Sequence, residues 1–122
     1  MRVAGIGFRK DAPLDSLRAV LTAVEAIGGK ADALASLPEK AADPLLQALA
    51  AERGLPLIPA PVRGIATPTQ SPRIQSMHGT GSVGEATALA VAGPGAKITV
   101  ARTCARDGMA TCAMAETKDP TA

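Results

Sequence analysis

Short apolar runs alternate with segments of helical periodicity along this chain. The run at residues 2–8 predicts a buried strand, and apolar residues from Leu14 to Ile27 then recur at helical spacing behind Pro13. The remaining predicted elements are strand 32–37, a helix between Asp43 and Gly54, strand 55–58, a helix from Ser82 to Gly93, and strands 97–103 and 109–115. This alternation predicts an α/β fold: a single three-layer α/β/α domain with a mostly parallel mixed sheet of about five strands and a C-terminal antiparallel hairpin.

The length and composition fit one domain built from small side chains. The chain has 122 residues, of which 47% are hydrophobic, and Phe8 is the single aromatic residue. We expect a domain over residues 1–116 and a flexible tail at 117–122. No apolar run approaches the roughly 20 residues of a membrane-spanning helix, and the first residues lack the apolar region of a signal peptide. These features predict a cytoplasmic protein without a membrane partner.

The segment GTGSVGEATALAVAG at residues 79–93 predicts a glycine-rich loop that leads into a helix. Ser82 and Glu85 have capping-box spacing, and the free N–H groups of a first helical turn attract anions. Gly79, Gly81 and Gly84 satisfy the dinucleotide pattern GxGxxG. However, the preceding residues are polar and follow a proline-rich connection, whereas that pattern requires an apolar strand there. The segment therefore predicts an anion site that is not a dinucleotide site.

Basic residues dominate the second half of the chain. From Arg53 to Arg106 the sequence contains six Arg and Lys residues but a single acidic residue, Glu85. Because this half lacks aromatic residues on which bases could stack, nucleic acid is not an expected partner. In the predicted topology Arg9, Lys40 and the long connection at residues 59–82 meet at the carboxyl edge of the sheet, where such folds bind ligands. A small anionic molecule is the favoured ligand, and a solvated basic surface is the alternative.

Few residues are candidates for catalysis or for holding a metal. His78, the single histidine, and Glu85 are candidate acid or base residues, although Glu85 also suits a capping role and His78 an ordinary loop position. One histidine and two separated cysteines make no metal site, so no metal and no cofactor are expected.

The turn at Asp107-Gly108 determines whether the two cysteines lie on the same face of the sheet. A two-residue turn there pairs Arg106 with Met109 and Cys104 with Thr111, and places Cys104 and Cys112 on opposite faces of the sheet. A three-residue loop would instead bring the thiols diagonally onto one face. We favour the interpretation that both cysteines are small buried side chains over one in which they have a redox role.

Several segments resemble the family formed by CobE and the C-terminal domain of CbiG, which act in cobalamin (vitamin B12) biosynthesis. They are GIGFRK at 5–10, DALASLPEKAADPLLQALAAERGLPL at 32–57, TPTQS at 67–71 and the segment at 79–93. They occur in order over most of the chain, from about residue 3 to 115. The resemblance implies an α/β/α domain, and since this sequence starts at the first strand of the shared domain, we expect the free-standing CobE form.

The resemblance also implies a ligand, a precorrin or hydrogenobyrinic-type corrinoid with many carboxylates around a flat apolar ring. We expect the protein to bind it as a carrier, chaperone or accessory factor, with other enzymes of the pathway as further potential partners. The alternative is an enzyme, a hydrolase that opens the lactone of a precorrin-5A-type intermediate and releases acetaldehyde. Phe8 is expected either to pack on the ring or to belong to the core. The expected ligand-binding residues are Phe8, Arg9, Lys40, Thr67, Thr69, Ser71, His78, Gly79, Gly81 and Ser82, and the catalytic candidates are Glu85 and His78.

Overall fold

The sheet has five strands, and its one antiparallel strand lies inside it. The computed structural model describes residues 1–61, 65, 67 and 82–117. The strands are β1 (Arg2–Phe8), β2 (Ala33–Ser36), β3 (Leu57–Pro59), β4 (Lys97–Cys104) and β5 (Ala110–Glu116), in the order β3-β2-β1-β5-β4. The first three are parallel, and β5 runs antiparallel between β1 and β4. The predicted fold class is confirmed, and β4 runs in the same direction as β1.

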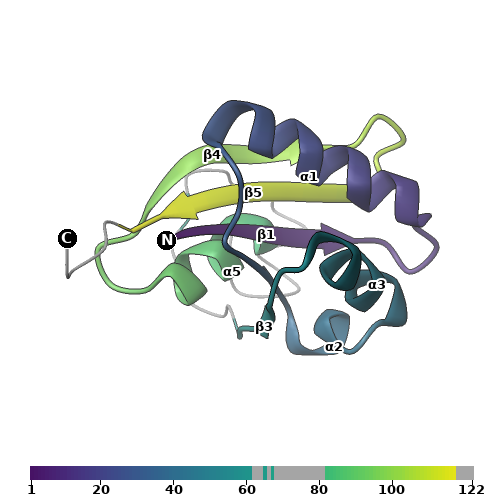
Figure 1. The fold of residues 1–122 in the computed structure, drawn as a ribbon, viewed down its shortest axis with the longest axis horizontal. Coiled ribbons are helices and arrows are strands. Elements are labelled where there is room, and N and C mark those ends of the chain that lie inside the picture. Colours follow the sequence, from purple (N-terminus) through teal and green to yellow (C-terminus); the bar gives the residue numbers. More distant parts are fainter. Residues whose placement is uncertain (62–64, 66, 68–81, 118–122) are drawn as a thin grey trace.

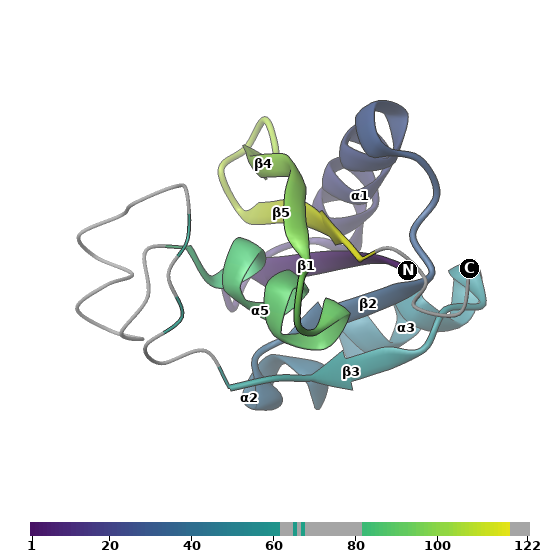
Figure 2. The ribbon, with the colours of Figure 1, turned by 90° about the vertical axis from the view of Figure 1, so that its left-hand side faces the viewer.

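Helices cover both faces of this sheet. Helices α1 (Leu14–Gly28) and α3 (Pro44–Arg53) lie on one face, which we call the α1 face, and α5 (Val83–Ala92) lies on the other, the α5 face (Figures 1 and 2). The N-cap Asp43 accepts a hydrogen bond from the N–H of Leu45 at 2.8 Å, and Gly54 ends α3 with a φ of 63°. The residues that predicted the two ends of α3 thus act as its caps.

The structure differs from the expectations around α2 and β3. Residues that the sequence left as a connection form a one-turn helix, α2 (Pro38–Ala41), because Pro38 occupies its first turn, where a missing N–H costs nothing. Strand β3 is shorter than expected and begins at Leu57, after Pro56. The carbonyl of Pro56 accepts a hydrogen bond from Leu34, so this segment still joins the edge of the sheet.

Large apolar side chains fill the α1 face. Alternate residues of β1, Ala4, Ile6 and Phe8, pack with Leu17 and Leu21 of α1. All five are buried, and both leucines are completely inaccessible to solvent. Burial of such side chains stabilises a fold by about 1.5–3 kcal/mol each. This face therefore contains the main hydrophobic core.

The α5 face is packed through glycine and alanine. A Cβ atom on Gly5 would lie 1.9 Å from the carbonyl oxygen of Gly84, and one on Gly84 would lie 3.1 Å from the carbonyl oxygen of Gly5. Helix α5 thus contacts β1 backbone to backbone. Gly84, the third glycine of the GxGxxG pattern, permits this close approach.

The β4–β5 hairpin keeps the expected register with a longer loop. Ala105 donates to Ala110 at 2.8 Å, so Arg106 and Met109 lie within the loop, where the sequence had predicted that they pair. Gly108 has a φ of 70° and closes a turn with Ala105, which explains the longer loop.

The two cysteines are free and lie on opposite faces, as the two-residue turn had predicted. Cys104 still pairs with Thr111 because the loop gains an even number of residues. Cys112 is buried in the α1-face core, and burial raises the pKa of its thiol. The expectation that both cysteines are buried is wrong for Cys104, which is exposed on the edge strand β4.

Among the helices that the structure describes, none is long and apolar enough to cross a membrane.

Candidate functional site

The carboxyl ends of four strands meet at one edge of the sheet. Strands β1, β2, β3 and β4 end there, and α2 follows β2 directly. Helix α5 also begins there, at Val83 after its N-cap Ser82. The loop of the β4–β5 hairpin projects from the same edge (Figure 1). We call this the carboxyl edge, and it is the edge at which ligands bind to open α/β sheets.

Phe8 and Lys40 are in direct contact at the carboxyl edge. The Lys40 Nζ lies 4.6 Å from the centroid of the Phe8 ring, and such a contact contributes about 0.5–1 kcal/mol at an exposed site. Phe8 belongs to the α1-face core and is only 8% exposed. Of its two expected roles, the structure therefore places Phe8 in the core, with Lys40 covering the remaining face of its ring.

Arg9 follows Phe8 in the sequence, and its backbone contacts the hairpin. Its backbone N–H donates to the carbonyl of Met109 at 2.8 Å, which ties the end of β1 to the end of the hairpin loop. The side chain is exposed. Arg9 and Lys40 therefore follow neighbouring strands at the same edge, as the topology had predicted.

The start of α5 contains two fully buried polar residues. The Ser82 Oγ accepts a hydrogen bond from the N–H of Glu85 at 3.3 Å, so Ser82 is the predicted N-cap. The Glu85 carboxylate crosses to β4, where its Oε2 accepts from the N–H of Arg102 at 2.9 Å. Glu85 thus links the first turn of α5 to β4 in addition to its place in the cap.

Most of the remaining expected site residues lie outside the described residues. This holds for Thr69, Ser71, His78, Gly79 and Gly81. Thr67 is described and is buried, at 8% exposed. The predicted meeting of the glycine-rich loop with Arg9 and Lys40 consequently stays a prediction, apart from the position of Ser82.

Cationic side chains at the carboxyl edge lack acidic partners within the described part of the chain. Every ion pair between described residues involves Arg2, Arg18 or Arg53, which lie elsewhere in the fold. Asp43, Glu85 and Asp107 accept hydrogen bonds from neighbouring elements, whereas Asp11 and Glu39 are exposed. The cations of this edge without an ion pair to a described carboxylate are Arg9, Lys10, Lys40, Arg102 and Arg106.

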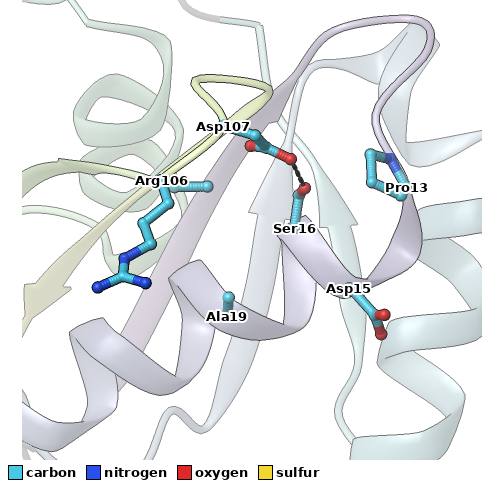
Figure 3. Close-up of a pocket in the computed structure, with 7 residues that line it drawn as sticks. Pro13, Asp15, Ser16, Ala19, Arg106 and Asp107 are labelled. Carbon is cyan, nitrogen blue, oxygen red and sulfur yellow. Dashed lines mark hydrogen bonds between the residues drawn. The ribbon is translucent and has the colours of Figure 1, made fainter.

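Sequence reasoning missed a link between the hairpin loop and α1. The Ser16 hydroxyl donates to the carboxylate of Asp107 (Figure 3). This carboxylate also accepts from the N–H of Met109 at 2.9 Å. The bond from Ser16, followed by the bond from Met109, lowers the pKa of Asp107. The sequence had identified Asp107 only as a turn residue, since nothing in its spacing points to Ser16.

The same link borders a shallow hollow of about 260 Å³ between α1 and the hairpin loop (Figure 3). Pro13 and Ala19 line it from the helix side, and Arg106 extends along its rim. Within the described ranges, no group of three or more His, Cys, Asp or Glu residues is placed to hold a metal ion.

Comparisons with known proteins identify the family. The family described as "Cobalamin synthesis G C-terminus" matches residues 2–115. The crystal structure of "CobE, a protein from the cobalamin (vitamin B12) biosynthetic pathway" is similar with a TM-score of 0.78 and 30% identity, covering 96% of this chain and 90% of that one.

The crystal structure of "cobalamin biosynthesis protein chiG" from Agrobacterium tumefaciens is similar with a TM-score of 0.76 and 37% identity. The match covers 98% of this chain and 100% of that one. A comparison with curated protein sequences gave no match. The chain belongs to the CobE/CbiG C-terminal family and is a protein of cobalamin biosynthesis.

Proposed function

We propose that this protein binds a corrinoid intermediate, a precorrin or a hydrogenobyrinic-type compound, as a carrier, chaperone or accessory factor of corrin ring synthesis. The observation that carries the proposal is the set of cations at the carboxyl edge that have no described carboxylate as an ion-pair partner. A corrinoid intermediate presents many carboxylates around a flat ring. Arg and Lys bind carboxylates through charge-assisted hydrogen bonds, which are about twice as strong as neutral ones.

The positions of these cations suit a ligand with several separated carboxylates. Lys40 stands on α2 over the ring of Phe8, Arg9 follows β1, and Arg102 lies on β4, so the charges are spread along the edge. The N-terminus of α5, whose residues are buried, adds the positive end of a helix dipole at the same edge. The ligand would lie across the carboxyl edge, with its carboxylates directed at these groups.

The environment of Glu85 favours binding over hydrolysis by this residue. A carboxylate that activates water must reach the reacting atom, whereas Glu85 is fully buried and accepts a hydrogen bond from the backbone of β4. The second candidate base, His78, lies outside the described residues. Lactone hydrolysis therefore has less support than binding.

A spectroscopic titration tests the proposal, because corrinoids absorb visible light. Hydrogenobyrinic acid, which keeps its carboxylates, should show a saturable spectral change that weakens with salt, whereas cobinamide, whose acid side chains are amides, should bind far more weakly. Replacing Lys40 by Ala should weaken binding about tenfold. The matched control Lys97→Ala, at the opposite edge, should leave affinity unchanged.

Absence of any spectral change, together with no co-elution in gel filtration, would contradict the proposal. Incubation with a lactone-bearing precorrin separates the alternative function. If the protein catalyses hydrolysis, mass spectrometry detects loss of the lactone and release of acetaldehyde. An unchanged mass with retained binding supports the carrier role.

A further inference from the structure

Strand β4 departs from regular pairing next to Glu85. Its register with β5 shifts between Ile98 and Val100, and again between Val100 and Thr103. At the second shift Val100 pairs with Met114 and Thr103 with Cys112, so two residues of β4 lie opposite one residue of β5. Such a bulge turns the strand and leaves one residue outside the regular ladder. Arg102 is at this bulge, and its N–H donates to Glu85.

The side chain of Arg102 lies on the α5 face. Its Nη2 is 3.8 Å from the Sγ of Cys104. Cys104 pairs with Thr111, and Thr111 pairs with Gly7. A Cβ atom on Gly7 would lie 3.2 Å from the Thr111 Oγ1 and 3.9 Å from the Val83 Cγ1, which places this row of residues beside the first turn of α5.

The row formed by Gly7, Thr111 and Cys104, which we call the shelf, is not fully covered. Gly7 and Thr111 are partly exposed and Cys104 is exposed, whereas Gly5, one step further along β1, is buried beneath Gly84. The shelf is therefore a part of the α5 face that α5, starting at Val83, leaves accessible. Arg102 stands at its outer end.

We propose that Arg102 binds a ligand carboxylate at the shelf and that Glu85 is the positioning residue that aims it there. The proposal rests on the corrinoid-binding function and adds to it a specific cation and the group that orients it. The Glu85 carboxylate accepts a hydrogen bond from the N–H of Arg102 and thereby stabilises the conformation of the bulge. Because the bulge sets the direction in which the side chain leaves β4, a change at Glu85 alters binding through Arg102.

Affinity for hydrogenobyrinic acid in four variants tests this assignment. Arg102→Ala should weaken binding roughly ten- to a hundredfold, since it removes a charge-assisted hydrogen bond. Glu85→Ala should weaken it to a similar extent, whereas Glu85→Gln, which keeps an oxygen acceptor for the N–H, should stay within about threefold of the unaltered protein. In the double variant with Ala at both positions, the loss should not exceed that of Arg102→Ala alone.

The matched control is Lys97→Ala, at the other end of β4, which should bind like the unaltered protein. Backbone hydrogen exchange gives a readout that needs no ligand. The Arg102 amide should be protected in the unaltered protein and in Glu85→Gln, and should exchange faster in Glu85→Ala. This measurement also shows whether each variant is folded.

The outcomes separate the two proposals. If the unaltered protein does not bind hydrogenobyrinic acid, the proposed function is wrong, and the role of Arg102 is wrong with it. If it binds and Arg102→Ala binds equally well, only the assignment of Arg102 is overturned. If Glu85→Ala weakens binding by the same factor with and without Arg102, Glu85 does not act through Arg102 and its positioning role is overturned.

Discussion

The two faces of the sheet are packed by different means. On the α1 face, leucine and isoleucine side chains fill the space between sheet and helices, with Leu17, Leu21 and Ile6 fully buried. On the α5 face, glycine and alanine let helix and strand backbones touch, and the buried groups include Glu85 and Thr87. Burial of apolar area stabilises the first face, whereas close fit and hydrogen bonds determine the geometry of the second.

This difference indicates a division of roles. A helix that contacts a strand through glycine has little freedom to shift, because backbone atoms cannot rotate away as side chains can. The first turn of α5 and the bulge of β4 are therefore held in fixed positions beside the shelf. The α1 face supplies the stability on which this arrangement depends.

The largest effect should come from adding a methyl group on the α5 face. Gly5→Ala places a Cβ 1.9 Å from the Gly84 carbonyl oxygen and 2.9 Å from the Ala88 nitrogen. Because both atoms belong to the backbone, we expect a loss of about 4 kcal/mol in the free energy of unfolding, above the usual range for overpacking. Urea denaturation measures it.

Gly7→Ala is the matched control on the same strand. Its nearest contact is the Thr111 hydroxyl at 3.2 Å, which belongs to a side chain, so its loss should stay below about 1 kcal/mol. Equal losses at the two glycines would show that α5 is not closely fitted to β1.

A slightly smaller effect should follow from deleting a large side chain on the α1 face. Leu21→Ala leaves a cavity in the fully buried core and should lower the free energy of unfolding by about 3 kcal/mol. Affinity for hydrogenobyrinic acid should be unchanged under conditions where the variant is folded. A loss of affinity without a loss of stability would contradict the division between the two faces.

Removing the cap of α5 should moderately reduce both the stability of the protein and its affinity for the corrinoid. Ser82→Ala deletes the acceptor of the Glu85 N–H and should cost about 1 kcal/mol of stability. It should also weaken corrinoid binding, because the first turn of α5 becomes less ordered. Asp43→Ala, which removes the corresponding cap of α3, should cost about as much in stability and leave affinity unchanged. Equal effects of both variants on affinity would contradict a specific role for the start of α5.

The smallest effect should be a change in the pH dependence of stability. Hydrogen bonds from Ser16 and Met109 lower the pKa of Asp107 below its ordinary value of 3.8. The carboxylate therefore contributes stability that is complete well above pH 3.8 and is lost as pH falls through the lower pKa of the folded state. Asp107→Asn should thus flatten the acid limb of the stability profile, as measured by denaturation between neutral pH and pH 3. An unchanged acid limb would show that the Ser16–Asp107 bond does not form in solution.

Local signals explain why much of this fold was predictable. Proline and glycine mark the ends of helices and strands in the sequence. The helix caps also lie where the sequence predicts them, at Asp43, Gly54 and Ser82. The insertion of β5 between β1 and β4 was not predictable, because it depends on pairing between residues far apart in the sequence. For the same reason, the hydrogen bond between Glu85 and the Arg102 backbone had no signal in spacing.

The positions of three candidate site residues at the carboxyl edge were predictable from the sequence. Arg9, Lys40 and Ser82 follow from topology, since the carboxyl ends of parallel strands share an edge. For Arg102, the sequence indicated only that it is one of the basic residues in the second half of the chain. Its position at the shelf results from a bulge, and bulges arise from packing between elements.

An NMR titration tests the central claim, that the carboxyl edge binds a corrinoid, most directly. Backbone amide shifts of the ¹⁵N-labelled protein would be followed as hydrogenobyrinic acid is added. Shift changes should concentrate at the carboxyl edge and leave the amino ends of the strands unaffected. The residues expected to shift are Gly7, Arg9, Lys40, Ser82, Arg102 and Thr111, and those expected to stay constant are Lys30, Asp32, Gly95 and Lys97. Saturable shifts confined to the first set would support the claim, and shifts centred on the second set, or none at all, would contradict it.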